Sequence, residues 1–170
     1  LDTSTKLYSF SNNFLSDLGR TVSHSEEINF FSSQLFNMSL IMAGFIFIYF
    51  YIEVRKIFRG NIANMVLVLG SAAGVLGGIS IAGVGLTPAN LFFDMHVFFA
   101  HWLFRFMLIA SICYMPAIYF HPNINNRYAL GYVFFCTSIL FYIIISELGP
   151  SPKASLFALQ MQVVAQKAIL

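Results

Sequence analysis

A polar stripe in an otherwise apolar segment is the chemically most unusual feature of the sequence. Residues 91–105 open an apolar run of membrane length, and this stretch contains Asp94, His96, His101 and Arg105. On a helix that turns about 100° per residue, Asp94, His101 and Arg105 fall within about 40° of one another, whereas His96 points to the other side. Each ionisable group in such a helix is costly to bury, so we expect it to serve a site or to have a partner.

Acids and imidazoles are the side chains that can transfer protons in a reaction. Four residues are candidates for this work: Asp17, Asp94, His96 and His101. Ser16 lies beside Asp17 and is a conceivable nucleophile, so a membrane-embedded hydrolase or transferase is one alternative function. No zinc-ligand spacing and no matched histidine pair for a haem is present, so we expect neither a metal nor a cofactor.

Two cations in the apolar segments predict nearby anions. Arg105 lies about 16 Å beyond Asp94 along a helix, too far for direct pairing. Lys167 lies in the last apolar stretch, about 13 residues from its start, and so at a similar depth. Because an unpaired cation in hydrocarbon costs several kcal/mol, we expect acids from the outer loops, a watery cavity or an anionic ligand to compensate.

These residues together predict a polar cavity that opens to the outer leaflet and binds the headgroup of a lipid or small amphiphile. The predicted ligand-binding residues are Arg20, Arg105, Glu147, Gln162 and Lys167, with Asp17, Asp94 and His101 also on the wall. Two other interpretations stay open. The charges could form a buried structural network that fixes helix pairing, or they could pair with another subunit of a larger membrane complex.

The composition indicates that lipid is the solvent for most of the surface. Of the 170 residues, 58% are hydrophobic and 9% are charged, whereas soluble domains carry about 25% charged residues. The net charge of +2 is too small to suggest nucleic acid as a partner. Cys113 and Cys136 both lie in apolar runs, where packing is their expected role.

Five apolar stretches predict an all-α, polytopic transmembrane helix bundle. They cover residues 28–52, 62–86, 92–120, 128–146 and 154–170, after a polar segment at 1–27 that we assign to the outer face. The last stretch spans only about 25 Å, so it is a short or truncated span. Because the chain begins without Met, we expect a sixth span upstream in the native protein.

Small residues and loop charges predict how the bundle packs and inserts. Gly70, Gly74, Gly78 and Ala82 recur at every fourth position, which is typical of a central packing helix. Three of the chain's basic residues, Arg55, Lys56 and Arg59, follow the first span, and Arg127 follows the third. The positive-inside rule therefore predicts that these loops are cytoplasmic and that the N-terminal segment is outside, as in a bacterial inner membrane protein.

The sequence Ser16-Asp17-Leu18-Gly19, with Asp94-Met95-His96 and the end at 162–167, carries a resemblance. It resembles an uncharacterised bacterial family of polytopic membrane proteins, a domain of unknown function with a Ser-Asp-Leu-Gly motif in its first outer loop. That family is distantly similar to the DRAM/Sfk-type membrane proteins of eukaryotes. The resemblance implies six helices, no established reaction, and a lipid-related role, with Ser16, Asp17, Gly19 and His96 as the positions of interest.

Overall fold

Long helices make up almost the whole chain in the computed structural model, which describes residues 8–58 and 64–169. A short 3-10 helix, η1 (Leu15–Gly19), precedes five α-helices: α1 (Phe30–Ile57), α2 (Asn64–Leu86), α3 (Phe93–Tyr119), α4 (Arg127–Leu148) and α5 (Leu156–Lys167). The described residues form no strand beyond one isolated bridge between Val22 and Ile28. The predicted all-α class is confirmed. Some parts of the sequence predictions lie outside the described residues. These are residues 1–7 of the polar segment, Arg59, residues 62–63 of the second predicted span and residue 170 of the last.

Four of the helices are long and apolar enough to cross a membrane. They are α1 to α4, with 22 to 28 residues in their apolar segments. At 1.5 Å per residue the shortest extends about 33 Å, which covers the roughly 30 Å of a bilayer's hydrocarbon. This fits a membrane protein. The fifth predicted span is not confirmed, because α5 has 12 residues and reaches only about 18 Å.

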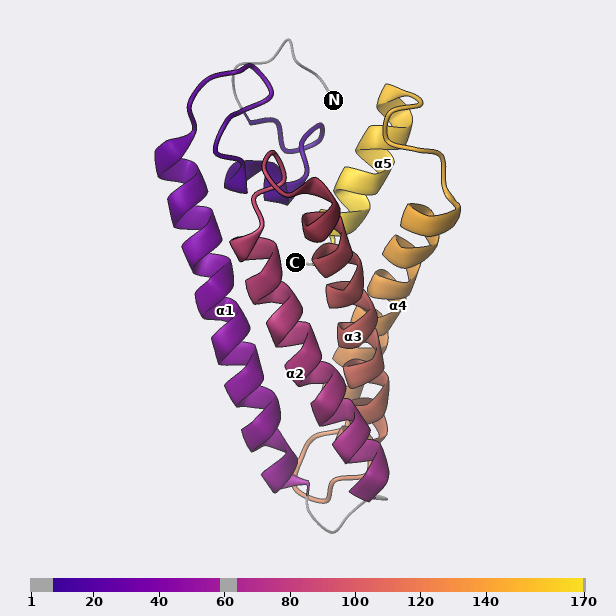
Figure 1. The fold of residues 1–170 in the computed structure, drawn as a ribbon. Helices are drawn as coiled ribbons and strands as arrows, with labels where there is room; N and C mark the ends of the chain where they lie inside the picture. Colours follow the sequence, from indigo (N-terminus) through magenta and orange to yellow (C-terminus); the bar gives the residue numbers. More distant parts are fainter. Residues whose placement is uncertain (1–7, 59–63, 170) are drawn as a thin grey trace.

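The helices stand side by side, with the N-terminal segment across one end. α2 lies between α1 and α3, and α4 follows on the far side of α3 (Figure 1). The segment that contains η1 covers the end where α3 begins and α4 ends, and α5 starts at this same end and extends only partway along the bundle (Figure 1). We call this the capped end. The loop between α3 and α4 lies at the opposite end.

Glycines let α2 approach its neighbours closely. A Cβ added to Gly78 would lie 2.8 Å from the carbonyl oxygen of Gly44 on α1, and one added to Gly74 would lie 2.1 Å from the ring of Tyr51. No side chain fits at such distances, so α1 and α2 pack backbone to backbone. This packing agrees with the small-residue pattern in the sequence.

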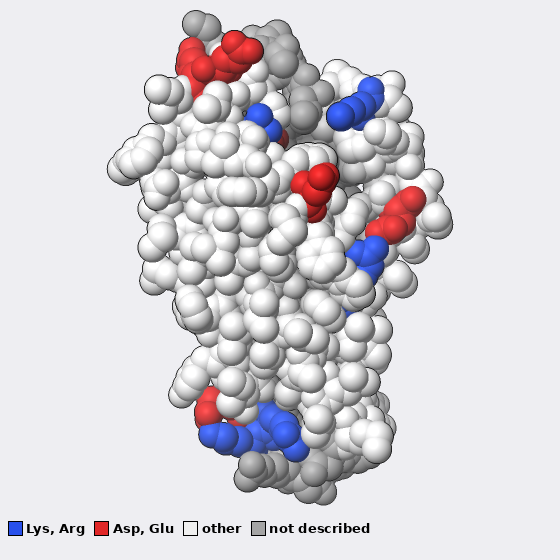
Figure 2. Space-filling model, viewed as in Figure 1, with Lys and Arg blue, Asp and Glu red and all other residues white. Residues whose placement is uncertain are grey.

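The outer surface of the helices is apolar, as contact with lipid requires. Large side chains such as Met42, Phe45 and Phe134 are exposed. Basic side chains gather at the end opposite the capped end, and the zone above them carries no charge on the face that Figure 2 shows. The buried core is aromatic in part, with Tyr51, Tyr114 and Tyr142 among its members.

Candidate functional site

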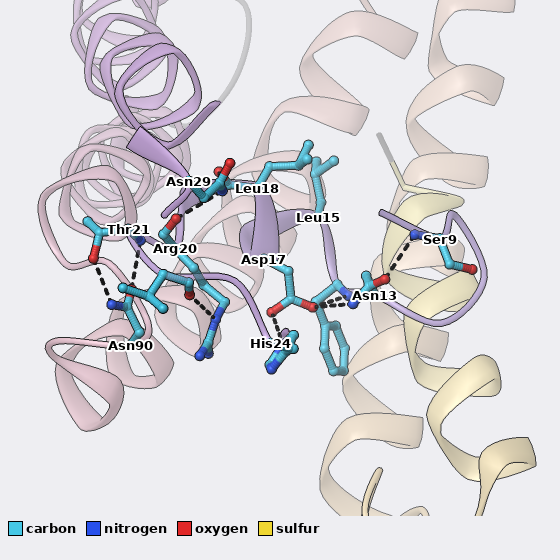
Figure 3. Close-up of polar contacts among 12 residues, drawn as sticks. Ser9, Asn13, Leu15, Asp17, Leu18, Arg20, Thr21, His24, Asn29 and Asn90 are labelled. Atoms are coloured by element: carbon cyan, nitrogen blue, oxygen red, sulfur yellow. Dashed lines mark hydrogen bonds and ion pairs between the residues drawn. The ribbon is translucent and has the colours of Figure 1, made fainter. Parts of the chain in front are cut away.

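The carboxylate of Asp17 organises the turn that contains η1. Its Oδ2 accepts hydrogen bonds from the backbone N–H of Phe14 at 2.9 Å and from Nδ2 of Asn13 at 3.4 Å. Its Oδ1 lies 3.0 Å from Nε2 of His24 (Figure 3). The side chains of Asp17 and His24 are only 11% and 13% exposed. Asp17 therefore holds the N-terminal segment in its folded shape from three sides.

The polar start of α1 binds the backbone of this turn. Nδ2 of Asn29 donates to the carbonyls of Leu18 at 3.2 Å and Arg20 at 3.0 Å (Figure 3). Asn37 donates to the carbonyl of Gly19 at 3.0 Å. A Cβ on Gly19 would lie 2.4 Å from Oδ1 of Asn37, so the close approach requires glycine here. These bonds give the polar residues at the start of the first span a structural role.

Two further anchors fix the N-terminal segment over the bundle. Thr21 donates its N–H to Oδ1 of Asn90 at 2.9 Å, and Nδ2 of Asn90 donates back to the Thr21 hydroxyl at 2.7 Å (Figure 3). On α5, Nζ of Lys167 donates hydrogen bonds to the backbone carbonyls of Phe10 and Asn13. The segment is thus tied both to the loop before α3 and to α5.

Lys167 takes part in this anchoring. Its Nζ lies 4.3 Å from the ring centroid of Phe10, a favourable cation–π distance. Partial burial lowers the pKa of Lys167, and the charge of Asp17 opposes that shift. Gln160 and Gln166 on the same helix also bind the segment, through Asn12 and the N–H of Leu15.

A cavity of about 410 Å³ lies below the N-terminal segment at the capped end. It is enclosed by this segment, the start of α3, the end of α4, the loop after α4, and α5. Its polar lining residues are Ser16, Asp17, Arg20, His24, His96, His101, Ser146, Ser151, Lys153, Gln162 and Gln166. Phe14, Phe93, Val97 and Tyr142 are among its apolar ones.

Six of the ten residues proposed from the sequence for catalysis or ligand binding line this cavity: Ser16, Asp17, Arg20, His96, His101 and Gln162. The other four, Asp94, Arg105, Glu147 and Lys167, are not among its lining residues.

The four others have separate surroundings, and their predicted roles receive no support from the geometry. Arg105 forms an ion pair with Glu147. Asp94 is exposed in the first turn of α3, where the helix dipole favours an acid without any ligand. Lys167 binds the N-terminal segment as described above.

Two cavity residues with ionisable side chains, His24 and Lys153, were not predicted from the sequence. Each lies alone in a loop, and no local pattern marks it. Lys153 reaches the cavity because the loop after α4 is held down: Nε2 of Gln162 donates to the carbonyl of Pro150 at 2.9 Å. Only the paired prolines at 150 and 152, which stiffen this loop, give a weak sequence signal.

The cavity carries an excess of positive charge. Nε of Arg20 donates to the carbonyl of Val22 at 3.2 Å, and neither Arg20 nor Lys153 forms an ion pair within the part of the chain that the structure describes. Asp17, the acid on the wall, already has its hydrogen bonds to His24 and Phe14. The arrangement therefore favours an anion.

His96 lines this cavity with one ring nitrogen committed to the backbone. The residue is 6% exposed, and Nδ1 lies 2.7 Å from the carbonyl oxygen of Thr87. Because a carbonyl can only accept, Nδ1 carries the proton, and in the neutral ring Nε2 is then the acceptor. Among the described residues no cluster of three or more His, Cys, Asp or Glu side chains is placed to hold a metal ion.

The fold and the cavity define a class: an all-helical protein with four helices able to cross a membrane and a positively charged cavity at one end of them. Comparisons with protein-family models, with curated proteins and with solved structures give no match.

Proposed function

We propose that the protein is an integral membrane protein that binds the anionic headgroup of a lipid or small amphiphile in the cavity at the capped end. The cations Arg20 and Lys153, which form no ion pair with another described residue, carry this proposal. A bound phosphate or carboxylate would accept charge-assisted hydrogen bonds from them, which are stronger than bonds between neutral groups. Asp17 does not compete with the ligand for these cations, because its carboxylate is already bound to His24 and to the backbone N–H of Phe14.

The size and position of the cavity support a headgroup as the ligand. Its volume of about 410 Å³ is within the usual range for small-molecule sites, and polar groups are combined with Phe14, Phe93 and Val97 as in such sites. The lining residues on α3 and α4 lie close to the helix ends, where lipid headgroups meet the protein.

The location follows from the distribution of basic residues. Arg55, Lys56 and Arg127 lie at the end opposite the cavity, so the positive-inside rule places that end in the cytoplasm. We propose insertion in a bacterial inner membrane with the N-terminal segment outside. The resemblance to the family with the Ser-Asp-Leu-Gly motif stays a prediction, as does a sixth span.

A membrane-embedded hydrolase or transferase is the second candidate, because Ser16, Asp17 and His96 line the same cavity. It predicts that the protein cleaves the lipid it binds, and that Ser16→Ala abolishes cleavage while binding persists. A role as an accessory subunit stays a prediction.

Lipid binding to the purified protein in nanodiscs tests the main proposal. We expect phosphatidylglycerol and phosphatidic acid to bind in preference to phosphatidylcholine with the same acyl chains. The double variant R20Q/K153Q should weaken the binding of both anionic lipids by at least roughly tenfold, because two charge-assisted contacts are lost. The control K56Q/R127Q removes two cations at the opposite end and should bind as the wild type does. Equal binding of all three lipids, or an unchanged R20Q/K153Q variant, would overturn the proposal.

A further inference from the structure

The buried side chain of Gln162 offers a second acceptor to the cavity. It is 6% exposed, and its Nε2 donates to the carbonyl of Pro150 at 2.9 Å. This bond sets the orientation of the amide, because the carbonyl cannot donate. The remaining atom, Oε1, accepts no hydrogen bond from the described residues, and Gln162 lines the cavity.

Gln162 and His96 therefore repeat one arrangement on two different helices. Each uses its nitrogen donor on a backbone carbonyl, Pro150 or Thr87. Each is thereby left with an acceptor, Oε1 or Nε2, on a side chain that is 6% exposed. Neither acceptor is among the described side-chain atoms that are both buried and without a partner, so each is accessible, and a ligand hydroxyl can donate to it in place of water.

The two features of the cavity together restrict the chemistry of the ligand. Arg20 and Lys153 favour an anionic group on the ligand, whereas His96 and Gln162 favour hydrogen-bond donors that carry no charge. The bare phosphate of phosphatidic acid supplies the charge but no alcohol hydroxyl, and a choline headgroup has no hydroxyl either. A cationic amine would supply donors but would be repelled by Arg20 and Lys153.

We infer that the ligand is a polyol phosphate, whose phosphate meets Arg20 and Lys153 while its hydroxyls donate to Nε2 of His96 and Oε1 of Gln162. This inference rests on the proposed binding of an anionic headgroup and assigns its chemical class. Among lipids, phosphatidylglycerol has this chemistry.

Two anionic lipids that differ in the glycerol of the headgroup test the inference without any mutation. Wild-type protein in nanodiscs should bind phosphatidylglycerol roughly fivefold or more tightly than phosphatidic acid of the same acyl chains, the worth of about one hydrogen bond. Equal binding, or tighter binding of phosphatidic acid, would overturn the polyol assignment. The preference of both lipids over phosphatidylcholine would then still uphold the proposed function.

Variants of His96 and Gln162 test whether these two residues cause the preference for phosphatidylglycerol over phosphatidic acid. His96→Asn keeps an amide donor near the position of Nδ1 for the Thr87 carbonyl and removes the acceptor at Nε2. It should abolish the preference for phosphatidylglycerol and leave the affinity for phosphatidic acid unchanged. Gln162→Met should also reduce the preference, and it should weaken the binding of both lipids because it removes the bond that holds the loop of Lys153. His121→Asn at the opposite end is the matched control. Retention of the full preference in both His96→Asn and Gln162→Met, with melting temperatures that show folded protein, would contradict the inference.

Competition with soluble glycerol 3-phosphate distinguishes a lipid ligand from a water-soluble one. If the ligand is a lipid, millimolar glycerol 3-phosphate should leave bound phosphatidylglycerol in place. If it displaces the lipid, the polyol phosphate class stands and the lipid assignment of the proposed function fails.

Discussion

Arg105 on α3 and Glu147 on α4 form an ion pair between positions that are 42 residues apart in the sequence. Their side chains are 32% and 41% exposed, so the pair lies at the surface of the bundle rather than in its core. Glu147 lies in the last turn of α4, next to Ser146 of the cavity wall. The pair therefore joins α3 to the end of α4 near the cavity.

The first prediction follows from this pairing. Arg105→Met and Glu147→Met should each destabilise the protein by about 1 kcal/mol or less, because both side chains are partly exposed near the end of α4 and water screens their attraction. The double variant R105M/E147M should recover most of that loss. Unfolding in bilayers or bicelles with a denaturant measures all three differences. If the two single losses simply add in the double variant, the two residues do not interact.

The second prediction concerns two glycines that differ in their surroundings. A Cβ on Gly74 would lie 2.1 Å from the ring of Tyr51, whereas nothing lies within 4 Å of the corresponding position on Gly131. Gly74→Ala should therefore destabilise the protein by about 1–3 kcal/mol through overpacking. Gly131→Ala, inside α4, should be neutral or stabilising by up to about 1 kcal/mol. Thermal unfolding of both variants checks this, and a similar effect at both positions would contradict the close packing of α1 and α2.

The third prediction concerns the attachment of the N-terminal segment. Lys167→Met removes the hydrogen bonds to the carbonyls of Phe10 and Asn13. We expect this segment to become more accessible, by roughly 2 kcal/mol of local opening free energy, because bonds to a charged donor are lost. Limited proteolysis and hydrogen exchange within residues 8–19 report the opening. Lys153→Met removes an exposed cation without such bonds and should leave the cleavage rate of this segment unchanged.

The fourth prediction concerns the orientation of the chain in the membrane. In a background without Cys113 and Cys136, a cysteine introduced as Ser25→Cys should react with a membrane-impermeant maleimide added outside intact cells. Asn126→Cys, in the loop between α3 and α4, should react only after the membrane is opened. The reverse pattern would place the cavity on the cytoplasmic side and refute the proposed topology.

Much of the fold was predictable because long apolar segments have one way to satisfy their backbone in lipid, the helix. The extents predicted for the first four spans lie within a few residues of α1 to α4, apart from an earlier end of the first at 52 instead of Ile57. The fifth span is not confirmed: α5 has 12 residues, and its residues Gln160, Gln162 and Gln166 bind the N-terminal segment and the loop after α4.

The sequence by itself determined the helical class, the apolar surface and the close packing of α2, because these depend on composition and on spacing within one segment. It also marked Asp17, Arg20, His96, His101 and Gln162 as polar groups that need an explanation. Only the tertiary structure decided that Arg105 pairs with Glu147 and that Lys167 anchors the N-terminal segment. It likewise placed His24 and Lys153 at the cavity. Partners that come from separate segments follow from how the helices pack, and no local pattern in the sequence records that geometry.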